Sequence, residues 1–110
     1  MIIEKKTDFS LFTSDENVFE DFFNSFLTEE KNYEEAHLII HILNTIKTTS
    51  KDILQFLEFA KNRKENNTSF VIVNTVVDVD DFPEEINIVP TLQEAADIIE
   101  MENIERELGF

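Results

Sequence analysis

Short apolar segments alternate with polar ones along the chain, and several have the length and composition of β-strands. Residues 2–5 and 9–13 carry strand-forming side chains on either side of the polar residues 6–8, which predicts an opening hairpin. Three later segments are also predicted strands, and they span residues 36–43, 69–77 and 86–89. The first of these is continuously apolar, as is typical of a strand covered on both faces, and the second is rich in β-branched residues, as is typical of a central strand.

Three other segments carry apolar side chains at helical spacing, and each begins behind a residue that can cap a helix N-terminus. They are residues 15–29 behind Ser14, residues 51–65 behind Ser50 and residues 92–108 behind Thr91. Thr91 and Glu94 also match a capping box, and Asn66 with Asn67 can replace glycine in a left-handed C-cap. The acidic stretch 78–85 predicts a loop or a single helical turn.

The resulting order ββαβαββα predicts one α/β domain over residues 1–110, with helices packed on a mixed sheet. Phenylalanines recur on one face of the first predicted helix at positions 19, 22, 23 and 26. Such a stripe could line a ligand pocket or a partner groove. A helical aromatic stripe more often forms core, however, and we assign this one to the core.

The formal charge of −15 restricts the kinds of partner that the protein can bind. Nucleic acids and anionic lipids are held by clustered Lys and Arg, so neither is expected as a partner. The segment from Asp78 to the end contains eleven acidic side chains and a single basic one, Arg106, whereas residues 47–64 are the most basic stretch. The acidic surface could simply resist aggregation, or it could attract a basic partner.

The chain has no cysteine, which excludes disulfides and cysteine-ligated zinc. Its start, MIIEKKTDF, lacks the apolar run of a signal peptide, and no apolar run approaches the length of a membrane span. These features predict a cytoplasmic protein.

The candidate metal ligands and catalytic groups are few. His37 and His41 stand four residues apart in an apolar run, but no cysteine and no carboxylate at a ligand spacing completes a metal site, so we expect structural histidines. An acidic cluster could attract a cation, but it lacks the EF-hand pattern and favours a solvated turn; it comprises Asp78, Asp80, Asp81, Glu84 and Glu85. The single glycine, Gly109, excludes a phosphate loop, a dinucleotide fingerprint and a nucleophile elbow. We expect no catalytic residue, no metal and no cofactor.

Three hydroxyl side chains, Thr48, Thr49 and Ser50, stand directly ahead of a predicted helix in KTTSKDILQF. They could be a phosphorylation site, a phosphate cradle or only the helix cap. A phosphate on Ser50 would lie at a helix N-terminus between Lys47 and Lys51, where its charge is favoured. Serine is also among the best N-cap residues, so capping alone explains its presence.

The order of the elements, together with the ending INIVPTLQEAADIIE, resembles the sulphate transporter and anti-sigma-factor antagonist (STAS) domain. In that family a loop bearing Asp-Ser-Ser-Gly precedes the second helix, and its phosphorylatable Ser or Thr controls binding to a partner kinase. The resemblance maps the acceptor to Thr49 when hydroxyls are aligned and to Ser50 when apolar residues are aligned. The family's Asp and Gly are missing here. The resemblance implies a non-catalytic regulatory domain that binds another protein.

A second resemblance concerns the ending EMENIERELGF, which is similar to that of short bacterial proteins named ribonuclease Z. That enzyme needs a His-x-His-x-Asp-His cluster to hold two metals, and this chain has only His37 and His41. Two alternatives to a regulatory domain follow. The protein could be an accessory partner of an enzyme such as a ribonuclease, meeting a basic surface through Glu100, Glu102, Glu105 and Glu107, or it could bind a small apolar ligand between the Phe-rich helix and the sheet.

Overall fold

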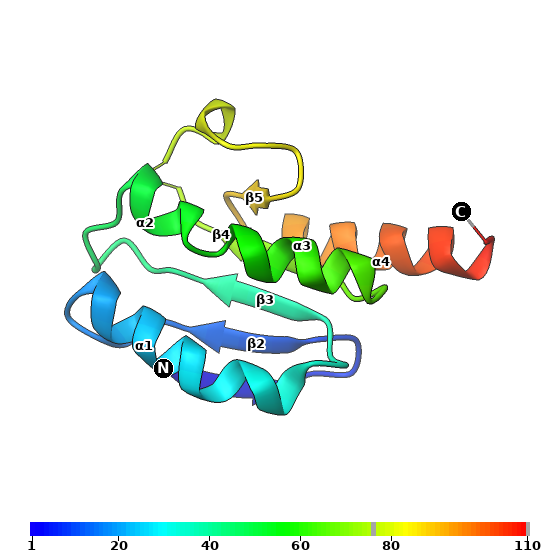
Figure 1. Ribbon diagram of the computed structural model, residues 1–110, viewed down its shortest axis with the longest axis horizontal. Coiled ribbons are helices and arrows are strands. Elements are labelled where there is room, and N and C mark those ends of the chain that lie inside the picture. The colour runs from blue at the N-terminus through cyan, green and yellow to red at the C-terminus, as the bar shows by residue number, and fades with distance from the viewer. Residues whose placement is uncertain (76, 110) are drawn as a thin grey trace.

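A computed structural model describes residues 1–75 and 77–109, which form a five-stranded mixed sheet with helices on both faces (Figure 1). The strands lie side by side in chain order: β1 (Ile2–Lys5), β2 (Ser10–Thr13), β3 (Leu38–His41), β4 (Phe70–Val73) and β5 (Asn87–Val89). β1 is antiparallel to β2, and all the other neighbouring pairs are parallel. The predicted α/β class and the mixed sheet are therefore confirmed.

The helices account for one difference from the predicted order. They are α1 (Phe19–Glu29), α2 (Ser50–Leu54), α3 (Leu57–Glu65) and α4 (Leu92–Glu107), with 3-10 turns η1 (Glu30–Tyr33) and η2 (Val79–Asp81). The single helix predicted over 51–65 is thus two helices. The break arises because the amides of Gln55 and Phe56 donate to carbonyls three residues back, at 3.2 and 2.9 Å, and this tighter turn points the Phe56 ring into the core.

The parallel strands are shorter than predicted. Directly after β3 the backbone is bound by polar side chains, because Asn74 donates to the carbonyl of Ile42 and Ser14 accepts the amide of Leu43. β3 ends at His41 and β4 at Val73, whereas the sequence predicted strands to 43 and 77. Residue 76 of the second prediction lies outside the described residues. Of the two alternatives predicted for 78–85, a loop or a single helical turn, the structure has a single turn, η2, and Asn67 has the left-handed conformation predicted for it, with φ of 62°.

Both faces of β3 and β4 are buried, and alternate side chains enter two separate clusters. Leu38 and Ile40 pack with α1 and α3 on the face toward the viewer in Figure 1, whereas Ile39 packs with α4 behind the sheet. Side chains alternate in the same way along β4, where Val71 joins the α4 cluster. The prediction that the segment 36–43 forms a strand covered on both faces is confirmed for β3, and β4 is central as predicted.

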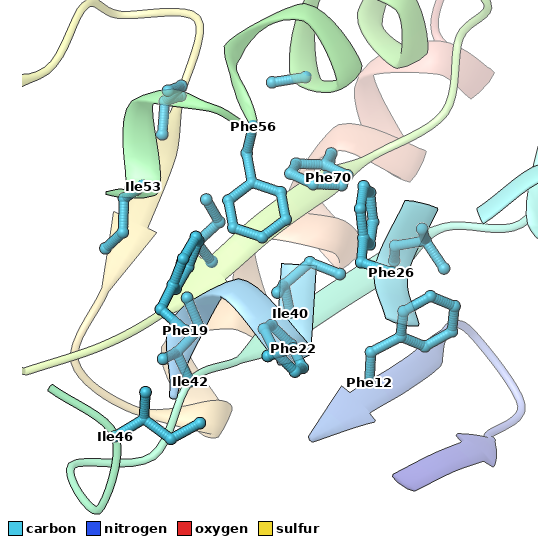
Figure 2. Close-up of a cluster of buried hydrophobic side chains, with 14 residues drawn as sticks. Phe12, Phe19, Phe22, Phe26, Ile40, Ile42, Ile46, Ile53, Phe56 and Phe70 are labelled. Atoms are coloured by element: carbon cyan, nitrogen blue, oxygen red, sulfur yellow. The ribbon is translucent and has the colours of Figure 1, made fainter. Parts of the chain in front are cut away.

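The larger cluster is built from phenylalanines (Figure 2). Phe22, Phe26 and Phe56 are completely buried, and the ring of Phe26 lies 5.0 Å from the rings of both Phe56 and Phe59 in edge-to-face contacts. The Phe-rich helix therefore forms core, as predicted. Its rings fill the space between α1 and the sheet, where the alternative prediction placed a small apolar ligand.

Ser14 does not cap α1, contrary to the prediction. The helix begins at Phe19, with Val18 at the N-cap position, and Ser14 is buried. Its Oγ accepts the amide of Leu43 at 2.9 Å. The serine satisfies a backbone donor where β3 leaves the sheet, and this takes the place of a bond to the helix.

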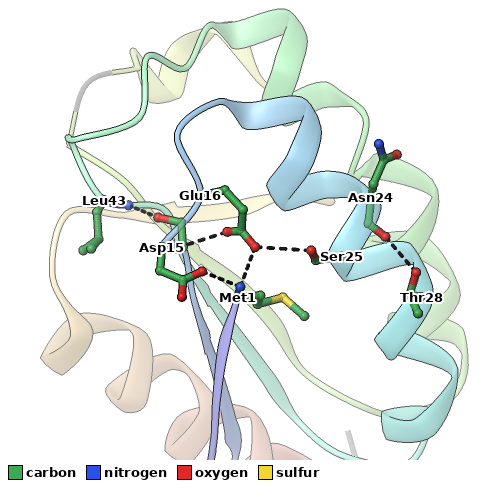
Figure 3. A network of polar contacts seen from close by, with 8 residues as sticks. Met1, Asp15, Glu16, Asn24, Ser25, Thr28 and Leu43 are labelled. Carbon is green, nitrogen blue, oxygen red and sulfur yellow. Dashed lines mark hydrogen bonds and ion pairs between the residues drawn. The ribbon is translucent and has the colours of Figure 1, made fainter.

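The acidic residues after Ser14 also serve a different purpose from the one predicted. Asp15 and Glu16 bind the amino group of Met1 instead of lying in the first turn of α1 (Figure 3). Glu16 additionally accepts a hydrogen bond from Ser25 of α1 at 3.2 Å. These contacts join the start of β1 to the segment that enters α1.

Substituting Phe26 by alanine tests the aromatic core. We expect Phe26→Ala to lower the free energy of unfolding by roughly 3–5 kcal/mol, because it removes a fully buried ring and leaves a cavity. The neighbouring Leu27 is 39% exposed, so Leu27→Ala should cost less than about 1 kcal/mol. Urea denaturation followed by circular dichroism measures both, and equal losses would contradict this description of the core.

Candidate functional site

The carboxyl ends of β2, β3, β4 and β5 meet at one edge of the sheet, and we call this the carboxyl edge. In open α/β sheets the loops at this edge commonly carry the binding residues. The segment with the predicted switch residues follows β3 and enters α2 there, near the β4–β5 connection that contains η2 (Figure 1). The candidate site is therefore the loop 44–52 with η2.

The three hydroxyl side chains of this loop have different environments. Thr48 is 6% exposed, and its Oγ1 donates to the carbonyl of Ile46 at 3.2 Å. Thr49 is the N-cap of α2: its Oγ1 accepts the amide of Asp52 at 3.2 Å, and the Asp52 carboxylate accepts the amide of Thr49 at 3.0 Å. Ser50 is the first residue of the helix. The prediction that Ser50 caps the helix is wrong, because the Thr49–Asp52 capping box satisfies two backbone donors where a cap at Ser50 would satisfy one.

Ser50 instead connects two loops of the carboxyl edge. Its Oγ donates to Oδ2 of Asp81, the last residue of η2, at 3.1 Å, and this bond lies at the surface. Lys47 and Lys51 are both exposed. The sequence indicated that the two lysines lie near the serine. It gave no indication of the Asp81 carboxylate, which is 31 residues further along the chain.

Other polar side chains at the carboxyl edge bind the loops to one another. The buried Asn74 donates to the carbonyl of Ile42 at 3.2 Å and accepts the amide of Val77 at 3.2 Å, and Thr75 donates to Asn44 at 2.9 Å. A cavity of about 110 Å³ beside them is lined in part by Asn44 and Thr75. Sequence reasoning missed Asn74, although a lone amide inside an apolar run was a usable signal.

The two histidines lie on the α4 side of the sheet and are half-buried. Nδ1 of His37 accepts the amide of Ser69 at 3.0 Å, so the neutral ring must carry its proton on Nε2. Burial lowers the pKa of His37, and the positive charge of Arg106 lowers it further. Burial likewise lowers the pKa of His41. Within residues 1–75 and 77–109, no three His, Asp or Glu side chains are grouped so that they could hold a metal ion.

The charged surfaces differ in part from those predicted. Glu102 accepts the hydroxyl of Ser69 at 2.5 Å and is half-buried, so only Glu100, Glu105 and Glu107 of the four glutamates predicted to meet a basic surface are exposed. Arg63 is 4% exposed and donates to the carbonyl of Ala36 at 2.7 Å. The basic stretch 47–64 therefore presents lysines to solvent, while its arginine fixes α3 against the start of β3.

Alanine substitutions distinguish the roles of Thr49 and Ser50. Thr49→Ala should lower the free energy of unfolding by about 1 kcal/mol, because it removes the N-cap hydroxyl that accepts the amide of Asp52. Ser50→Ala removes one surface hydrogen bond and should cost less than about 0.5 kcal/mol. Urea denaturation of both variants tests the assignment, and a larger loss at Ser50 would make Ser50 the cap.

The histidine contact predicts a pH dependence of stability. The pKa of His37 in the folded protein lies below its ordinary value of 6.5, so as the pH falls through 6.5 the unfolded chain binds a proton first and the free energy of unfolding decreases. Protonation of Nδ1 would also remove the bond to Ser69, which contributes roughly 0.5–1.5 kcal/mol.

The variant His37→Asn isolates this effect, because an asparagine Oδ1 can accept the same amide but does not titrate. When the pH is lowered from 7.5 to 5.5, the free energy of unfolding, measured in urea, should decrease more for the wild type than for His37→Asn. Identical differences for the two proteins would show that His37 does not contribute.

No protein-family profile matches this chain, and no curated protein matches it. Among the described residues, no helix is both long enough and apolar enough to cross a membrane.

Proposed function

We propose that the protein is a non-catalytic regulatory domain that binds another protein at the carboxyl edge, through the loop 44–52 and the start of α2. The observation that carries this proposal is the exposed hydrogen bond from Ser50 to Asp81. It connects two loops of the edge at a hydroxyl that a kinase could reach. A partner that contacts both loops would therefore be sensitive to the state of one side chain.

Phosphorylation of Ser50 would act on this contact directly. A phosphate carries about −1.5 to −2 charges at neutral pH, so it would replace the donor hydroxyl by an anion facing the Asp81 carboxylate. Repulsion would separate η2 from α2, while the exposed Lys47 and Lys51 would draw the phosphate toward themselves. The modified edge would thus present a different surface to the partner.

Phosphorylation of Thr49 would have a different consequence, because it would place the phosphate beside the Asp52 carboxylate and disturb the capping box of α2. Thr48 is the least suitable acceptor of the three, since its hydroxyl is buried and bonded to Ile46. Ser50 is therefore the preferred switch in this proposal, and Thr49 is the alternative.

The resemblance to STAS domains supports the same function, and the α/β fold with a mixed sheet is compatible with it. The charge of −15 supports a protein partner over nucleic acid or an anionic membrane, and a cytoplasmic location suits a kinase-controlled switch. The proposal involves no cofactor, metal or catalytic residue.

The test combines partner capture with mapping of the binding surface. The tagged full chain is recovered from its native cells, and mass spectrometry identifies bound proteins and phosphorylated residues. The captured partner is then titrated into 15N-labelled protein. We expect shifts of amide signals concentrated in residues 44–55 and 78–82, and binding weakened on the order of tenfold by Ser50→Asp.

The matched controls are Ser50→Ala and Asp81→Asn, which remove the hydrogen bond or the carboxylate without adding negative charge. Asp81→Asn combined with Ser50→Asp should recover part of the lost affinity, because it removes the repelling partner. Shifts confined to other surfaces, or equal affinity for wild type and Ser50→Asp, would contradict the proposal.

A further inference from the structure

A groove of about 360 Å³ runs between α4 and the turn that joins β1 to β2. It lies on the face of the sheet opposite to α1 and α3, and near the end of the sheet opposite to Ser50 (Figure 1). Its apolar surface comes from Phe9, Ala96 and Ile104. Ile104 is 49% exposed although it belongs to a helix that packs on the sheet.

The rim of the groove carries charge of a single sign. Asp8, Asp97, Glu100 and Glu107 contribute four carboxylates, and no lysine or arginine is among the described residues that line it. Arg106 lies on the same helix but faces the sheet, where it donates to Ser69 at 2.9 Å and to Asn103 at 2.6 Å. The groove therefore combines an apolar floor with an acidic rim.

The helix that forms one wall is fixed in its orientation. Ala95 and Ile99 are buried against the sheet, and the contacts of Glu102 and Arg106 with Ser69 hold the C-terminal half. Two exposed apolar side chains of this helix, Met101 and Ile104, are therefore held in a defined orientation relative to the sheet while α4 is folded. Little ordering would be required when a partner binds this surface.

The same face of the sheet is only partly covered. α4 packs on β3, β4 and β5, and it is the single α-helix of the described chain on that face. Ile2 of β1 is in register with Thr13, and Thr13 is in register with His41 and, through it, with Val73. Because Val73 packs on the α4 side, Ile2 lies on the same side, and it is 49% exposed. A second helix beside α4 would fit the normal spacing of about 8–10 Å between packed helices and would cover this strip.

We propose that the groove docks an amphipathic helix from a partner protein, whose apolar side packs on Phe9 and Ile104 and whose flanking Lys or Arg side chains face the acidic rim. Charge decides between this occupant and a second copy of the chain, because a second copy would add another charge of −15 and place acidic rim against acidic rim. The groove is separate from the loop 44–52, so this proposal does not rest on the function proposed for that loop.

The probe is a synthetic helix of about 18 residues made of leucine and lysine, with leucines at i, i+3, i+4 and i+7. A second peptide has the same composition in scrambled order, so its charge is equal but it has no apolar face. Both are titrated into the 15N-labelled full chain. We expect the patterned peptide to bind at least about fivefold more tightly and to shift the amides of Phe9, Ala96 and Ile104.

Two kinds of variant separate docking in the groove from general attraction to an acidic protein. Ile104→Glu makes the chain more negative, so simple electrostatic attraction would tighten binding, whereas loss of the apolar floor should weaken it by roughly tenfold. Asp97→Lys with Glu100→Lys should also weaken binding by about tenfold or more, while Glu58→Lys with Glu65→Lys on α3, which changes the net charge equally, should alter it by less than about threefold.

Each contrary result overturns the proposal. One is equal or tighter binding by Ile104→Glu, and another is equal loss in the two charge-reversed variants. Amide shifts spread over the whole acidic surface would have the same meaning. Sedimentation of the free protein tests the other occupant: a dimer that Ile104→Glu dissociates would assign the groove to a second copy of the chain.

Discussion

Burial of β3 and β4 on both faces is the constraint on which the rest of the structure depends. Each strand sends alternate side chains into two clusters, so the protein needs a layer of helices on either side of the sheet. Phenylalanines of α1 and β4, together with Phe56 between α2 and α3, supply aromatic rings that pack against one another in one of these layers. Once these two strands are fixed, the loops that leave their carboxyl ends are brought together, and the candidate site results from that placement.

The main elements of the fold could be predicted because their signals are local. The apolar run before Leu43 identifies β3, the spacing of Phe19, Phe22 and Phe26 identifies α1, and Thr91 marks the start of α4. Each of these depends on side chains within one turn or one strand. The break between α2 and α3 could not be read in this way, because it follows from the position that the core offers to the Phe56 ring.

The candidate site was less predictable, because its contacts join residues that are distant in sequence. Ser14 satisfies an amide 29 residues away, and Ser50 meets a carboxylate 31 residues away. A serine before an acidic or apolar segment has the same local pattern whether it caps a helix or binds another loop. Thr49 was preferred over Ser50 as the cap because Asp52 lies three residues after it, a spacing that was visible in the sequence and was not used.

The two faces of the sheet are unequal, and this has a consequence for the protein's motions. Among residues 1–75 and 77–109, the cluster on the α1 and α3 face has fourteen buried members, against six on the α4 face. Regions with less buried apolar contact open more readily, so α4 should be the unit that exchanges its amide hydrogens first by local opening, ahead of β3 and β4. A protein built in this way can lose the order of its last helix transiently while the aromatic half of its core remains folded.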